Sequence, residues 1–120
     1  MANPGPASVQ TPNSQAPFSN IQQVAVLTVA LTPASVGSAT IAEQNFTITG
    51  LTVGDVIVWT KPALANAVAP VNMRVSAANT LTVAYVNPTA GALTPTAETY
   101  QLTVFRQVAN LPVLTTMPIL

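Results

Sequence analysis

Residues 71–87 have the sequence VNMRVSAANTLTVAYVN, in which apolar and polar side chains alternate on either side of a short Ala78-Asn79 connection. Such alternation is typical of strands that are buried on one face. Two strands joined by two residues are typical of an antiparallel β-hairpin. We therefore predict strands over residues 71–77 and 80–87. One face of the hairpin is expected to carry the apolar side chains Val71, Met73, Val75, Leu81, Val83 and Tyr85.

Four further segments on either side of the hairpin also have strand patterns: residues 22–31, 40–49, 55–60 and 98–107. Residues 22–31 are apolar on both faces, which is typical of a strand covered on both sides. In residues 40–49, Phe46 and Ile48 are expected to point inward, and the alternation slips near Glu43-Gln44, which predicts a β-bulge there. Residues 61–70 (KPALANAVAP) fit either one short helical turn or a loop. Six strands predict an all-β fold, an antiparallel β-sandwich of jelly-roll or Greek-key type.

The two ends of the chain differ from this body, which we assign to residues 21–107. Residues 1–20 contain four prolines and few large apolar side chains, so they predict an extended N-terminal arm. Residues 108–120 (VANLPVLTTMPIL) predict an extended apolar C-terminal tail, because Pro112 and Pro118 exclude a regular strand or helix. An exposed apolar tail needs cover, which either a neighbouring subunit or its own sandwich would provide. The candidate partner-interface residues are Phe18, Ile21, Leu111, Val113, Leu114, Met117, Ile119 and Leu120.

The charge content is low: 5% of residues are charged and the net charge is zero, whereas 49% are hydrophobic. An ordinary soluble domain is about 25% charged. We expect no nucleic-acid partner, because a basic footprint is missing, and no membrane partner, because there is neither a polybasic cluster nor a long apolar segment. A near-neutral surface favours association. The alternative is a soluble monomer with an uncharged surface.

The sequence contains little material for catalysis. It has no cysteine and no histidine, which excludes thiol nucleophiles, imidazole bases and the usual zinc ligands. We interpret Glu43, Asp55 and Glu98 as solvated strand ends and Lys61 as a surface lysine. Glu98 and Arg106 are eight residues apart on one strand, more than about 20 Å, so they are not expected to pair. We therefore predict no catalytic, cofactor or metal site and no small-molecule substrate.

Three other side chains have more than one interpretation. A cross-strand or cross-subunit carboxylate is the expected partner of Arg74. Trp59 and Tyr85 are expected in the core, and their alternative role is to stack against a sugar.

Two runs of the sequence, LTVGDVIVWTKP (residues 51–62) and VNMRVSAANTLTVAYVNPTAGALTPTAETYQLTVFR (residues 71–106), resemble small virion proteins encoded in the structural gene clusters of tailed bacteriophages. The similarity rests on a "GD-V" strand, an "R-VSAANT-L" hairpin and an "N-TAG" loop. The resemblance implies a capsid decoration (cement) protein with a β-sandwich or jelly-roll body. It brings no catalytic residues with it, and it does not include the two chain ends.

The resemblance also implies a set of partners and a location. The expected partners are the major capsid protein and copies of the chain itself, as a dimer or trimer. The expected location is the capsid surface of the virion, with the host cytoplasm during assembly. One alternative is a tail-fibre or receptor-binding module that contacts glycans through Trp59, Tyr85 and Tyr100. Another is an adhesion or pilus-like β-subunit. An enzyme is not expected.

Overall fold

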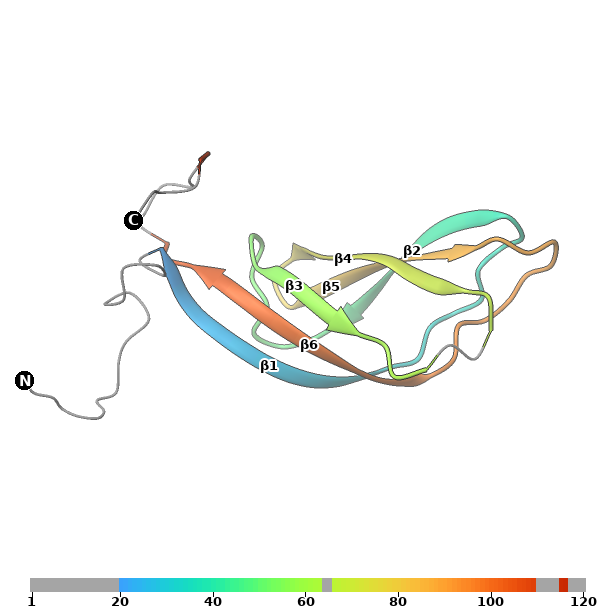
Figure 1. Ribbon diagram of the computed structural model, residues 1–120, viewed down its shortest axis with the longest axis horizontal. Helices are drawn as coiled ribbons and strands as arrows, with labels where there is room; N and C mark the ends of the chain where they lie inside the picture. Colours follow the sequence, from blue (N-terminus) through green and yellow to red (C-terminus); the bar gives the residue numbers. More distant parts are fainter. Residues whose placement is uncertain (1–19, 64–65, 110–114, 117–120) are drawn as a thin grey trace, which may run out of the picture.

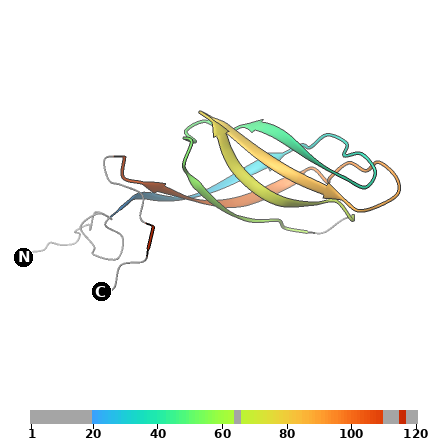
Figure 2. The same ribbon diagram turned by 90° about the horizontal axis from the view of Figure 1, so that it is seen from above.

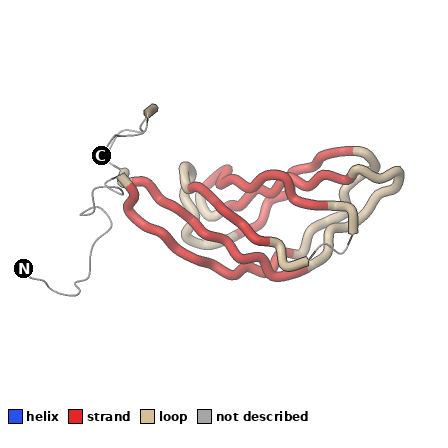
Figure 3. Tube along the Cα trace, in the orientation of Figure 1, coloured by secondary structure: helices blue, strands red, loops and turns tan. Residues whose placement is uncertain are grey.

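The computed structural model describes residues 20–63, 66–109 and 115–116. In these residues all regular structure is β-strand (Figure 3). The six strands are β1 (Ile21–Leu31), β2 (Thr40–Thr47), β3 (Val56–Thr60), β4 (Ala69–Ala77), β5 (Thr80–Asn87) and β6 (Glu98–Gln107). Each predicted strand is confirmed, with ends that differ by two residues or fewer. No helix in the described part is long and apolar enough to cross a bilayer.

The strands form two three-stranded antiparallel sheets, in the orders β1-β6-β3 and β2-β5-β4 (Figure 1). The predicted hairpin is β4–β5, and the other pairings join strands that are distant in sequence. The two sheets pack face to face around one core, to which both contribute. Its fully buried side chains include Leu81 and Tyr85 from β5 and Tyr100 and Leu102 from β6. The fold is therefore an all-β, two-sheet arrangement with β5 and β6 as the central strands.

The bulge predicted near Glu43-Gln44 is wrong, because β2 pairs with β5 in unbroken register from Thr40 to Thr47. Gln44 breaks the apolar alternation although its side chain is half-buried. Its amide donates to the carbonyl oxygen of Ala34 and accepts from the Ala34 N–H, both at 2.8 Å. Gln44 thus fixes the β1–β2 loop as a backbone segment would, which a polarity pattern does not reveal.

Irregular pairing occurs in β4 instead, between Pro70 and Asn72 and again between Val75 and Ala77. The first of these shifts turns Val71 away from the core, and its side chain is 53% exposed. The prediction that Val71 shares the inward face of the hairpin is therefore wrong. Met73 and Val75 do point inward, as do Leu81, Val83 and Tyr85.

Asn79 organises the turn at the start of β5. Asn79 has φ 60°, a left-handed conformation that asparagine tolerates better than most residues. Its N–H donates to the Leu51 carbonyl oxygen at 2.9 Å, and its side-chain oxygen accepts from the Gly50 N–H at 2.8 Å. The β4–β5 hairpin is thereby joined to the β2–β3 turn. Of the two structures predicted for residues 61–70, the loop is the one observed: the described residues of 61–68 are a loop, and β4 begins at Ala69.

The start of β1 and the end of β6 lie side by side. Ile21 pairs with Gln107, and the N–H of Val108 donates to the carbonyl oxygen of Asn20 at 2.9 Å. In both ribbon views the β1–β6 ribbon extends beyond the second sheet at this end (Figures 1 and 2). Asn20 and Val108 therefore lie side by side at one end of the body.

Candidate functional site

The outer face of the β1-β6-β3 sheet carries an exposed apolar patch. In its register Val24, Phe105 and Val56 form one row across the three strands, and Val26, Thr103 and Val58 form the next. The four valines are 51–60% exposed, and Phe105 is half-buried. We refer to Val24, Val26, Val56, Val58 and Phe105 as the valine face. It adjoins the end of the body where Ile21 pairs with Gln107.

The prediction that β1 is covered on both sides is wrong, because Val24 and Val26 face outward and are exposed. A fold with two sheets covers only one face of each sheet. Apolar side chains on the second face of β1 and β3 must therefore remain open within the described part of the molecule. Contiguous apolar surface of this kind is typical of interaction sites.

The outer face of the other sheet has a different character. Glu43 and Arg74 form an ion pair across the central strand, with nitrogen–oxygen distances of 2.9 and 3.2 Å. Beside this pair, the Thr82 hydroxyl donates to the Asn45 side-chain oxygen at 2.7 Å and lies 2.6 Å from the Ser76 hydroxyl oxygen. The carboxylate predicted for Arg74 is thus Glu43, in the cross-strand form. Ile41 and Val71 are also exposed on this sheet, but these polar side chains occupy the middle of its outer face, which makes it the comparison surface for the valine face.

All six charged side chains of the sequence form ion pairs with one another, three pairs in total. They are Glu43–Arg74, Asp55–Arg106 and Lys61–Glu98. The interpretation of Asp55 and Glu98 as solvated strand ends is wrong, since their side chains are only 2% and 11% exposed. Lys61 is likewise 11% exposed, so it is not a surface lysine. Glu98 and Arg106 do not pair with each other, as predicted.

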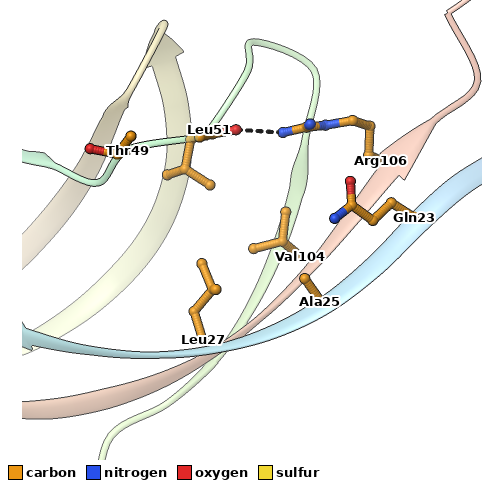
Figure 4. A pocket seen from close by; sticks show the side chains of 8 residues that line it. Gln23, Ala25, Leu27, Thr49, Leu51, Val104 and Arg106 are labelled. Carbon is orange, nitrogen blue, oxygen red and sulfur yellow. Dashed lines mark hydrogen bonds between the residues drawn. The ribbon is translucent and has the colours of Figure 1, made fainter.

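The Asp55–Arg106 pair ties the end of β6 to the turn before β3. Arg106 donates to both carboxylate oxygens of Asp55, at 2.9 and 2.7 Å. It also donates to the carbonyl oxygen of Gly50 at 2.7 Å (Figure 4). The Thr52 N–H also donates to Asp55, at 3.0 Å. These hydrogen bonds, chiefly those from Arg106, hold the pKa of the Asp55 carboxyl below its usual value. Asp55 is thus a charged anchor for a turn and has no free oxygen for chemistry.

Next to this pair a small cavity of about 170 Å³ opens between the sheets. Leu27, Leu51 and Val104 line it on the core side, and Gln23 and Arg106 lie toward its mouth (Figure 4). Pockets for small molecules usually measure about 300–1,000 Å³. The cavity is smaller than that, and we interpret it as a gap left where β1 diverges from the second sheet.

The aromatic side chains proposed for glycan stacking are directed into the core. Tyr85 and Tyr100 have no exposed surface, and Trp59 is half-buried against the core. Burial and the neighbouring Tyr100 raise the pKa of the Tyr85 hydroxyl above its usual value. The core placement expected for Tyr85 is confirmed. Neither tyrosine is able to stack on a sugar in this conformation.

Of the predicted interface residues, Ile21 is the one that the structure describes. It begins β1, is half-buried and lies at the end near the valine face. The remaining seven lie outside the described residues: Phe18, Leu111, Val113, Leu114, Met117, Ile119 and Leu120. Sequence reasoning missed the valine face itself. The signal for it was the apolar content on both faces of β1 and β3. A two-sheet fold covers only one face of each, so the other face had to be exposed.

Comparison of the chain with models of protein families, with curated proteins and with solved structures found no match. Within the described residues there is no group of three or more side chains of the types that hold metals. The valine face is therefore the candidate functional site that the geometry itself provides.

Proposed function

We propose that the protein is a structural virion component that binds the outside of a bacteriophage capsid and cements neighbouring major capsid subunits. The observation that carries the proposal is the valine face, an uncharged apolar surface near the paired start of β1 and end of β6. We name the capsid as the partner because two runs of the sequence resemble small phage virion proteins. The strand connections are proposed to be of jelly-roll or Greek-key type, as in such decoration proteins.

The physical basis of cementing is interface burial. Stable contacts bury about 800 Å² on each partner, and five side chains of this size offer a few hundred Å². At about 25 cal/mol per Å², the valine face contributes several kcal/mol before ordering costs are subtracted. An apolar tail that docks on the shell would add to this area. Because contacts repeat over a capsid, the summed effect on shell stability is large.

The low charge of the chain supports the same role. Burying an unpaired charge at an interface is expensive, and here each charged side chain already has a partner within the chain. Docking the valine face therefore removes no ion from water. The alternative of a glycan-binding module needs exposed aromatic rings, whereas Trp59 packs half-buried against the core.

Removal of the chain ends tests the proposed mechanism. We expect variants lacking residues 110–120 or residues 1–19 to keep the β-sheet circular dichroism and cooperative unfolding of the full chain. Bound copies per particle should fall at least tenfold in one or both variants, because apolar contact area is lost. The measurement is co-sedimentation with particles assembled from the major capsid protein of the same genome. Unchanged occupancy in both deletions would refute a role for the ends.

A further inference from the structure

Among the described strands, β1 forms the longest outer sheet edge. It lacks the charges, prolines and short length by which edges usually avoid pairing with other chains. β1 has eleven residues, and its sequence, IQQVAVLTVAL, contains neither a charge nor a proline. It hydrogen-bonds to β6 on one side, and no described residue forms a strand on the other side (Figure 1). An unpaired edge presents a row of free N–H and C=O groups that can pair with a strand of another chain.

The other three edges have the features by which proteins usually block such pairing. β3 has only five residues, and it lies against β4. β4 contains Pro70, Arg74 and two register shifts. β2 has eight residues and carries Glu43. The register of β1 is irregular only at its start, between Ile21 and Gln23. The contrast singles out β1 as the edge that is left open.

From this contrast we infer that the β1 edge binds the β1 edge of a second copy of the chain in antiparallel orientation. Two identical strands related by a two-fold axis pair antiparallel, so the same edge serves both copies. Like charges opposite each other destabilise such pairs, and β1 has none. The zero net charge of the chain also removes long-range repulsion between copies.

Pairing centred near Val26 would join the sheets into one of six strands, in the order β3-β6-β1-β1-β6-β3. The two valine faces would then form a continuous surface, since Val24 and Val26 lie on the strands that meet. The chain ends of the two copies would leave at opposite ends of β1, about 36 Å apart for eleven residues. The inference names the surface for the self-association that the proposed function includes, but it does not depend on binding to a capsid.

The native mass of the full-length protein tests the inference. We expect the wild-type chain to have twice its 12.3 kDa mass and Val26→Lys to raise the dissociation constant at least tenfold, because it places like charges opposite each other at the axis. Val58→Lys is the matched control: it is 55% exposed, against 60% for Val26, and lies on the same face but on β3. It should leave the dimer intact. A monomeric wild-type chain, or equal loss of dimer in both variants, overturns the inference.

Cross-linking tests the register without adding charge. The chain has no cysteine, so Val26→Cys and Val58→Cys each introduce a single thiol. Facing residues of paired strands lie within the Cα separation that a disulfide spans, about 4.4–6.8 Å. Under mild oxidation Val26→Cys should form a covalent dimer and Val58→Cys should not. Cross-linking of Val58→Cys alone would place the contact on another surface. A dimer that forms but does not bind particles would refute the capsid proposal and leave this inference standing.

Discussion

The double variant Val56→Lys/Val58→Lys is expected to bind particles about a hundredfold more weakly than the wild-type chain. Both valines lie on the valine face and are more than half exposed in the isolated chain, so the fold should tolerate the change. At the capsid each lysine would be buried without a partner. A cost of about 1.4 kcal/mol for each corresponds to a factor of ten. The measurement is the number of bound copies per particle as a function of free concentration.

The second sheet provides a matched control for this variant. Ile41 and Val71 are 65% and 53% exposed on strands β2 and β4, so Ile41→Lys/Val71→Lys makes the same chemical change on the opposite side of the molecule. We expect this control to bind particles as the wild-type chain does. Equal weakening by both double variants would mean that added charge, and not the valine face, controls binding.

Asn87→Ala is expected to lower the free energy of unfolding by about 3 kcal/mol, because it removes a fully buried amide and leaves its partners unsatisfied. The Asn87 side chain donates to the carbonyl oxygens of Val36 and Gly91, at 3.1 and 2.9 Å, and accepts from the Thr89 N–H at 3.0 Å. It therefore joins the loop after β5 to the loop after β1. Urea denaturation followed by circular dichroism measures the change.

Asn72→Ala is the control for this prediction, since Asn72 is exposed on β4. Its substitution should change stability by about 0.5 kcal/mol or less. If Asn87→Ala were no more destabilising than Asn72→Ala, the loop would not depend on the amide. The "N-TAG" loop would then need another explanation.

The strands could be predicted because their signal is local. Alternation in residues 71–87 identifies two strands, and the two-residue connection identifies their pairing. The other pairings, such as β1 with β6, join residues about 67 to 86 positions apart in sequence and have no local signal. The same limit applies to the irregular pairing in β4, which depends on the register with β5. The inward side chain of Gln44 depends on the path of the β1–β2 loop, whose Ala34 backbone it binds.

The ion pairs and the valine face were harder to predict for related reasons. Asp55 and Arg106 lie 51 positions apart, so their contact is a consequence of the fold and not of spacing. Val24 and Val56 become one surface only when β1 and β3 pair on either side of β6. The sequence shows that these side chains are apolar, but it does not show that they lie together on an exposed face. Association stays a prediction from composition, and the exposed valines are the surface that we propose for it.

The motifs that carry the resemblance to phage virion proteins acquire a structural meaning. Asn79 in the "R-VSAANT-L" hairpin and Asn87 in the "N-TAG" loop each bind backbone groups of another turn. Asp55 in the "GD-V" strand accepts from the Thr52 N–H of its own turn and from the Arg106 side chain. These residues shape the body and do not line the valine face. The valine face itself is defined by the exposure of its side chains and by the strand register.

Thiol accessibility on assembled particles shows directly whether the valine face is the surface that contacts the capsid. Val58→Cys and Ile41→Cys place single thiols on the two outer faces of the body, at valine and isoleucine side chains that are 55% and 65% exposed in the isolated chain. Both should react with a maleimide at similar rates in the free protein. On particles we expect Val58→Cys to react with the maleimide at least tenfold more slowly, while Ile41→Cys reacts as it does in the free protein. Equal reactivity of the two thiols on particles, or protection of Ile41→Cys alone, would contradict the proposal.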